Sequence, residues 1–205
     1  MHIFSIKFFN TNLKGTPILL ESAEDISPMP FWARMNNSTS EMFLFLSRLF
    51  TEKTEKGCIQ GCREDNYYGW IYHKNNGLAA VVICDSEYDQ RVAFSLMQKY
   101  MLHYESVSEN WAWAMIDKDN TSYDPKLKAM LNDYQNPQKI DPITNINKTL
   151  SDTKIVMHKS IDNMLARGEK IDVLLDKSAD LSRKSKQFLK KGKKLNSWCN
   201  SCSIS

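Results

Sequence analysis

The chain has 205 residues, of which 42% are hydrophobic and 25% charged, and its formal net charge is +3 at pH 7. This length and composition predict a globular protein of one or two domains and exclude a largely disordered chain. The longest apolar run, Leu78 to Cys84, is far too short to span a bilayer. Five cysteines, an odd number, and a start that lacks a secretory signal predict free thiols in the cytosol.

The first 137 residues alternate between strand and helix patterns. Residues with strand character form five short runs, at 3–9, 17–20, 58–63, 67–72 and 78–84, the run at 58–63 being the weakest. Apolar residues at helical spacing predict helices over 42–50, with Thr39 or Ser40 as the cap, over 92–101, capped by Asp85 or Ser86, and over 124–134. This order predicts an α+β domain with a meander sheet.

No motif of this domain indicates catalysis or a metal. Cys58 and Cys62 have a spacing that could suit zinc, but zinc normally takes four ligands and no second cysteine pair lies nearby. His73 and His103 belong to different predicted elements. A nucleophile elbow and a phosphate-binding glycine loop are both missing from the sequence. We therefore expect a protein that is not an enzyme and binds no metal or other cofactor.

The last third of the chain carries an apolar seam with alternating steps of three and four residues, the repeat of a coiled coil. Its apolar positions are Ile143, Ile146, Leu150, Met157, Met164, Ile171, Leu174, Leu181, Phe188 and Leu195. The other positions are Thr153, Ser160, Arg167, Ser178, Ser185 and Gly192. One uninterrupted helix over the seam would be about 80 Å long. Such a stripe cannot bury itself alone, so we expect it to pair with partner helices and to be disordered or docked when free.

Arg167 is the charged residue at the centre of this seam. A charge among apolar layers lowers stability but fixes register and partner choice, whereas on a loose helix an arginine can simply reach solvent. The run Leu165-Ala-Arg-Gly-Glu-Lys-Ile-Asp172, with Phe188 further on, resembles the R-SNARE motif of synaptobrevin-like proteins. The resemblance implies that Arg167 meets three glutamines contributed by partner helices in a four-helix bundle.

The carboxyl-terminal residues suggest lipid attachment. Cys202-Ser-Ile-Ser205 fits a prenylation signal in which a terminal serine favours farnesyl, and Cys199 is placed for a palmitoyl group. Residues 138–205 carry a net charge of +7, against −4 for residues 1–137. The lysines and arginines of 183–194, followed by Trp198, predict contact with an anionic cytoplasmic membrane surface. A solvated basic face is the simpler alternative, and few aromatics are interleaved for nucleic-acid binding, which we do not expect.

The amino-terminal part strengthens the resemblance. The stretch Leu78-Ala-Ala-Val-Val-Ile83, Glu87-Tyr88, Arg91-Val-Ala-Phe94 and Tyr134-Gln-Asn-Pro137 are similar to longin domains. The chain thus resembles a prenylated longin-domain R-SNARE without a transmembrane anchor. This implies a profilin-like longin domain over 1–134, with a five-stranded antiparallel sheet, one helix on one face and two on the other. A linker over 135–142, a long SNARE coiled-coil helix over 143–197 and a lipidation tail over 198–205 follow.

The resemblance implies vesicle fusion through pairing with three glutamine-SNARE helices. It also implies a prenyltransferase, a SNARE-disassembly ATPase with its adaptor, and cycling between the cytosol and the cytosolic faces of endomembranes such as the Golgi, endoplasmic reticulum, endosome or vacuole. A groove lined by Phe43 and Phe45 could hide the farnesyl group in a closed form, or these side chains could simply fill the core. The alternative function is a prenylated longin adaptor that recruits a GTPase or coat and dimerises through its tail.

Overall fold

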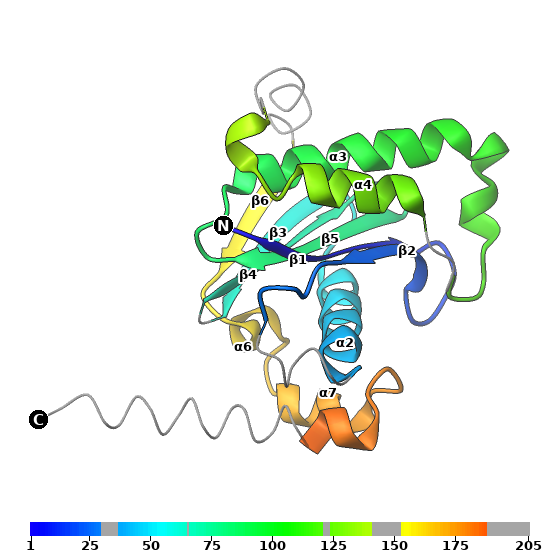
Figure 1. Cartoon of the computed structure of the whole chain (residues 1–205). Helices are drawn as coiled ribbons and strands as arrows, with labels where there is room; N and C mark the ends of the chain where they lie inside the picture. The colour runs from blue at the N-terminus through cyan, green and yellow to red at the C-terminus, as the bar shows by residue number, and fades with distance from the viewer. Residues whose placement is uncertain (30–36, 65, 121–123, 141–152, 188–205) are drawn as a thin grey trace, which may run out of the picture.

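Figure 1 shows the computed structural model of the chain, which describes residues 1–29, 37–64, 66–120, 124–140 and 153–187. One twisted sheet lies between two helical layers, so the expected α+β class is confirmed. Within these ranges the sheet has six strands in the order β2-β1-β5-β4-β3-β6. The strands are β1 (Ile3–Asn10), β2 (Ile18–Glu24), β3 (Cys58–Glu64), β4 (Tyr67–His73), β5 (Leu78–Asp85) and β6 (Lys154–His158).

One helix covers one face of the sheet and two helices cover the other, as expected. Helix α2 (Ser38–Lys53) lies below the sheet in Figure 1, and α3 (Gln90–Val107) and α4 (Pro125–Asp133) lie above it. Two 3-10 helices, η1 (Glu109–Met115) and η2 (Pro137–Lys139), follow α3 and α4. Two short helices come after β6, namely α6 (Ile161–Met164) and α7 (Ile171–Lys177), and the backbone is again helical at 183–187.

The core has a layer on each side of the central strands, because β1 and β5 are buried on both faces. Side chains of alternate parity along β5 pack against α3 and α4 on one face and against α2 on the other. Gly69 of β4 allows α2 to approach closely, since a Cβ there would lie 2.1 Å from Cε2 of Phe50. The buried apolar runs of the sequence therefore become the middle of the sheet.

The strand order differs from the expected meander. Strands β3, β4 and β5 do form one, but the β1–β2 hairpin joins it through antiparallel pairing of β1 with β5, so the first strand lies in the middle of the sheet. Five antiparallel strands match the expected number. The sixth, β6, pairs parallel to β3 and was not expected, because it comes from the segment predicted to be a coiled coil.

Two predicted helix caps are wrong by a few residues because the side chains have other partners. The Ser40 hydroxyl donates to Glu24 on β2 at 2.5 Å, and α2 begins already at Ser38. The Asp85 carboxylate accepts from the backbone N–H of Glu87 at 3.2 Å in a turn after β5. The N-cap of α3 is Asp89 instead, whose side chain accepts from the Arg91 N–H at 2.7 Å.

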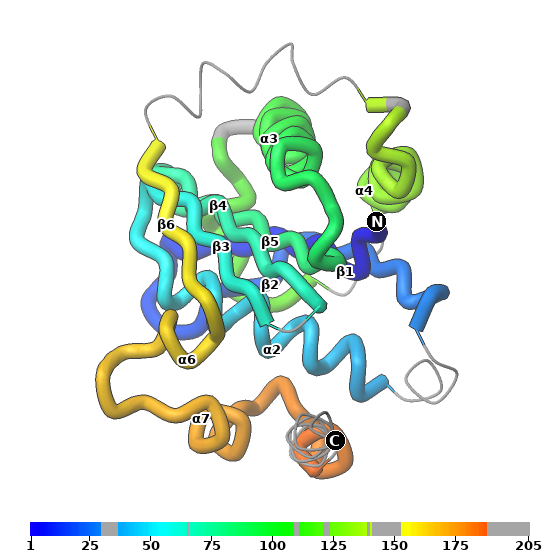
Figure 2. Tube along the Cα trace, turned by 90° about the vertical axis from the view of Figure 1, so that its left-hand side faces the viewer, coloured from blue at the N-terminus to red at the C-terminus, as the bar shows by residue number. Residues whose placement is uncertain are grey.

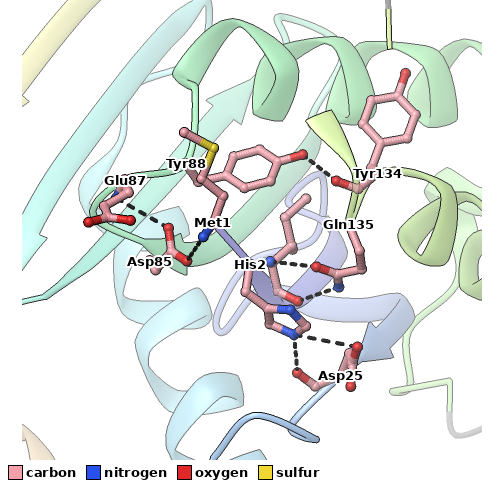
Figure 3. A network of polar contacts seen from close by, with 9 residues as sticks. Met1, His2, Asp25, Asp85, Glu87, Tyr88, Tyr134 and Gln135 are labelled. Carbon is pink, nitrogen blue, oxygen red and sulfur yellow. Dashed lines mark hydrogen bonds and ion pairs between the residues drawn. The ribbon is translucent and has the colours of Figure 1, made fainter. Parts of the chain in front are cut away.

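Hydrogen bonds of Tyr134 and Gln135 connect the end of the amino-terminal domain to β1 and to Tyr88, just before α3 (Figure 3). The Gln135 side chain accepts from the Ile3 N–H at 3.0 Å and donates to the Ile3 carbonyl at 2.8 Å. The Tyr88 hydroxyl donates to the Tyr134 carbonyl at 2.6 Å. These bonds satisfy buried polar groups beside α3 and fix the point from which the chain leaves the domain.

Residues 153–187, hereafter the docked segment, fold back along the amino-terminal domain instead of forming one long helix. In Figure 2 this segment runs from β6 at the sheet edge through α6 and α7 beneath α2. Docking is one of the two states expected for the free segment, and the long helix expected on pairing is not formed by these residues in the chain on its own. The physical reason is that an apolar seam without partner helices must be covered, and the nearest apolar surface is the domain's own.

Candidate functional site

The contact between α2 and the docked segment is the candidate functional site. An apolar cluster joins Phe45 and Leu49 of α2 to side chains of the docked segment. These are Leu165, Ile171, Leu175 and Leu181, each no more than 9% exposed. Phe45 and Leu49, one turn apart on α2, thus provide the surface on which four apolar residues of the docked segment are buried.

Docking covers part of the predicted seam. Met164, Ile171, Leu181 and Ser185 are buried, and Met164 belongs to the core cluster between α2 and the sheet. Thr153, Ser160, Leu174 and Ser178 are half-buried, while Met157 and Arg167 are exposed. The other seam positions, Ile143, Ile146, Leu150, Phe188, Gly192 and Leu195, lie outside the described residues. The seam therefore cannot be docked and fully available to partner helices at the same time.

At the sheet edge, β6 pairs with β3 in parallel, with Ile155 opposite Ile59 and Met157 opposite Gly61. Gly61 leaves room for this pairing, because a Cβ at that position would lie 2.5 Å from the Met157 sulfur. The Ile161 N–H donates to the Glu64 carboxylate at 3.0 Å just after the strand. The docked segment thus covers a strand edge that would otherwise present unpaired backbone groups.

Arg48 of α2 is the charged residue at the centre of the contact. Its guanidinium donates to Asp180 of the docked segment and to Asp119, and its side chain is only 12% exposed. Burial raises the pKa of the Asp180 carboxyl above its usual value, and the charge of Arg48 opposes that rise. Because the pair is largely removed from water, loss of one partner leaves a buried charge unsatisfied.

Glu41 and Lys53 bind the docked segment near the two ends of α2. The Glu41 carboxylate accepts from the Ser185 hydroxyl and from the Ser182 N–H, both at 2.7 Å. The hydrogen bond from Ser185 is the largest of the causes that lower the pKa of Glu41. Lys53 forms an ion pair with Glu169 at 2.5 Å. Both contacts are partly exposed, so they orient the segment more than they stabilise it.

The structure separates the two phenylalanines considered for a groove. Phe43 is 2% exposed and lies in the cluster between α2 and the sheet. Phe45 faces the docked segment and lines a partly open cavity of about 310 Å³, together with Leu49, Leu174 and the polar residues Arg48, Glu52 and Asp180. The size is at the lower end of the roughly 300–1,000 Å³ range of small-molecule pockets.

Leu165, Leu175 and Arg48 are residues of this contact that sequence reasoning did not identify. Leu165 and Leu175 each directly follow a seam residue, so the heptad pattern assigns them to the flank. Arg48 lies between the buried residues Ser47 and Leu49 of α2, and a charged side chain within this apolar stretch was the available signal. None of them could be paired from spacing alone with its partner across the contact, because α2 and the docked segment are separated by about a hundred residues or more.

Cys58, Cys62 and Cys84 are buried free thiols, and burial raises the pKa of Cys62 to about 12. His73 is held by the Thr54 carbonyl and the Thr11 hydroxyl, both at 2.8 Å. Within the described ranges no group of three or more potential ligands is placed to hold a metal ion. In those same ranges, every helix is too short or too polar to cross a bilayer. Cys199 and Cys202 lie outside the described residues.

Comparisons with known proteins match both halves of the chain. The synaptobrevin family model matches residues 142–203, and the model of the regulated-SNARE-like domain, longin, matches residues 32–127. The chain is 40% identical to a synaptobrevin homolog YKT6 of Debaryomyces hansenii over 181 residues, 88% of this chain and 90% of the relative. The Saccharomyces cerevisiae YKT6 is 36% identical over 201 residues, 97% of this chain and 98% of the relative. The VAMP-like protein YKT61 of Arabidopsis thaliana is 38% identical over 184 residues, 89% and 90% of the two chains.

Proposed function

The chain belongs to the longin-domain synaptobrevin family of R-SNAREs, and from that premise we propose that it drives fusion of intracellular vesicles by pairing with three glutamine-SNARE helices. The observation that carries the proposal is the seam around Arg167. Its apolar layers Met164 and Ile171 are buried against the chain's own longin domain, so this form is closed. Release of the docked segment exposes those layers, which then fold as a helix against partner helices.

Arg167 is the residue that aligns the bundle. It is exposed in the closed form, so the longin contact does not need its charge. In the bundle its guanidinium donates hydrogen bonds to the side-chain carbonyls of the three partner glutamines, and a slip by one heptad would leave the charge among apolar layers. We expect Arg167→Leu to weaken partner selection more than affinity, and unchanged selectivity in a partner-exchange assay would refute this role.

Assembly from residue 143 toward residue 195 brings the membrane-anchored ends together. Ser178, Ser185 and Gly192 are thin layers in the second half of the seam, and a glycine costs about 1 kcal/mol of helix stability. Zippering is therefore strongest around the centre. We expect the assembled bundle to be taken apart by the SNARE-disassembly ATPase with its adaptor.

Lipid attachment regulates the cycle. We propose that a prenyltransferase adds farnesyl to Cys202 and that Cys199 takes a palmitoyl group. One lipid chain gives only marginal, reversible binding, so the farnesylated protein shuttles from the cytosol and palmitoylation retains it on endomembranes. The cavity beside Phe45 and Leu174 is the candidate that covers the farnesyl group, because its apolar side lies between α2 and the docked segment.

The pairing is tested by mixing the full chain with the three glutamine-SNARE helices of a yeast Golgi fusion complex. We expect a four-component complex with a large gain in helix, measured by size-exclusion chromatography and circular dichroism. Self-association of the chain without a mixed complex would refute the proposal and favour a lipidated scaffold.

Flotation on vesicles that contain anionic lipid tests the lipid cycle with wild-type protein, Cys199→Ser and Cys202→Ser after lipidation in cells. We expect Cys202→Ser to stay soluble and Cys199→Ser to bind weakly. Phe45→Glu should move the lipidated protein toward vesicles, because a buried unpaired charge opens the α2 contact. An unchanged soluble fraction of Phe45→Glu would contradict the closed form proposed for the cytosolic protein.

A further inference from the structure

The docked segment reverses direction at a turn directly beside the central arginine. Helix α6 ends at Met164, and the Glu169 N–H donates to the Ala166 carbonyl at 2.9 Å, which makes 166–169 a β-turn. The Ala166 N–H donates to the Glu169 carboxylate at 3.0 Å, and Lys53 of α2 binds the same carboxylate. This turn lets Leu165, before it, and Ile171, after it, enter the same apolar cluster on α2.

Gly168 occupies the third position of this turn with a φ of +92°. A positive φ at the third position is the requirement of a type II turn, and side chains with a Cβ adopt it only with strain. A Cβ at this position would meet no atom within 4 Å, so space does not require glycine. The backbone angle alone explains why a glycine suits the closed form.

The helical form has the opposite preference. In a helix φ is about −63°, so Gly168 must rotate by roughly 155° when the segment zippers. Glycine is a poor residue inside a helix, because it loses more backbone entropy than alanine. Gly168, next to the central arginine of the seam, therefore favours the docked turn and disfavours the partner-bound helix.

We propose that Gly168 is the hinge that holds the chain in its closed form, by permitting the docked turn and opposing the helix of the bundle. The inference rests on the proposed function, since it takes the partner-bound form to be helical through position 168. It assigns a conformational role to the residue next to Arg167, while the Arg167 side chain itself stays exposed.

The two effects of Gly168→Ala add in one direction. The positive φ strains an alanine and so shifts the equilibrium from the closed toward the open form by roughly a factor of 5–30. The better helix propensity of alanine shifts the equilibrium further toward the helical form, by about a factor of 2–5. Opening without partners reports mainly the first factor, whereas helical pairing reports both. We therefore expect Gly168→Ala to raise the open fraction of the free chain about tenfold. Gly168→Asn should stay within about threefold of wild type, because asparagine tolerates a positive φ and is a poor helix former.

Gly15 offers a matched control. It too has a positive φ, +112°, and a Cβ on it would also meet nothing within 4 Å, but it lies in the β1–β2 loop of the longin domain. Gly15→Ala imposes the same kind of backbone strain away from the docked segment. It should lower the stability of the whole domain without opening the segment.

The test is amide hydrogen exchange of the full chain without partner proteins, read at β6 and α7, with amides of β1 and β5 as the reference for global unfolding. We expect exchange at β6 and α7 to be about tenfold faster in Gly168→Ala, with β1 and β5 unchanged. The hinge role would be overturned if Gly168→Ala exchanged at the wild-type rate, or if Gly168→Asn accelerated exchange as much as Gly168→Ala. It would also be overturned if β1 and β5 exchanged faster together with β6 and α7 in Gly168→Ala.

Pairing with the three glutamine-SNARE helices is measured separately on the same proteins. If wild type and variants all fail to pair, the proposed fusion function is wrong, while the exchange data still report whether Gly168 controls docking. If all pair and Gly168→Ala exchanges like wild type, the function stands and the hinge role is refuted.

Discussion

Leu175 provides a way to open the chain without changing a layer of the seam. It is 2% exposed in the cluster with Phe45, Leu49 and Leu181, yet it follows the seam residue Leu174 and lies on the flank of the predicted bundle. Leu175→Ala removes about three buried carbon groups at roughly 0.8 kcal/mol each, and the surrounding cluster can only partly fill the space. We expect the closed form to lose about 2–3 kcal/mol relative to the open form.

A loss of that size changes the open population about 30- to 150-fold. Native-state digestion with trypsin measures it, because cleavage within the docked segment follows the population of opened molecules. Leu174→Ala is the matched control. Its side chain is half-buried in the closed form, so cleavage should accelerate much less, at most about threefold.

In the complex with glutamine-SNARE helices, the order of the two effects should be reversed. Leu174→Ala removes a seam layer and should lower the melting temperature of the complex, whereas Leu175→Ala should leave it nearly unchanged. Equal cleavage rates for Leu175→Ala and wild type would refute the argument. So would a Leu174→Ala chain that opens as readily as Leu175→Ala.

Three further predictions follow from buried groups. Arg48→Met should favour the open form by about 2 kcal/mol, because the Asp180 carboxylate stays buried without its partner. Adding Asp180→Asn should recover at least half of that free energy in the digestion assay. Additive effects of the two substitutions would contradict the pairing. Burial, followed by the nearby charge of Asp124, raises the pKa of Glu21 from 4.5 to about 7, so the folded chain retains a proton that the unfolded chain has released between these pH values. The stability of the fold should therefore fall as pH rises from about 4.5 to 7. Glu21→Gln should remove about 1 kcal/mol of that fall, after allowance for the partial exposure of the side chain. Melting temperatures that fall equally with pH in wild type and Glu21→Gln would be the contrary result. Gly69→Ala should destabilise the longin domain by about 1–3 kcal/mol in urea unfolding, because the new Cβ meets Phe50, and unchanged stability would show that α2 can shift.

Much of the amino-terminal domain was predictable because its signals are local. Alternating residues mark β4, a continuous apolar run marks β5, and the Asn75-Asn76-Gly77 turn between them favours a hairpin, so their existence and pairing follow from neighbours in the chain. The position of β1 beside β5 was not predictable in this way. It depends on pairing between residues 68 to 81 positions apart, from Asn10 with Leu78 to Ile3 with Cys84, which no periodicity encodes.

The heptad spacing by itself determined that residues 143–195 can form one apolar stripe with Arg167 at its centre. That pattern describes the segment as it pairs with other helices, because a helix is the conformation that aligns those positions. What the described part of the segment does in the chain alone was decided only by the tertiary structure. Arg48 with Asp180, Phe45 with Leu175, and β3 with β6 are contacts between distant parts of the chain, and they stabilise a turn at Gly168 where the repeat predicts helix. The same apolar side chains can be buried in either way, so the sequence shows which residues need covering and the fold shows which surface covers them.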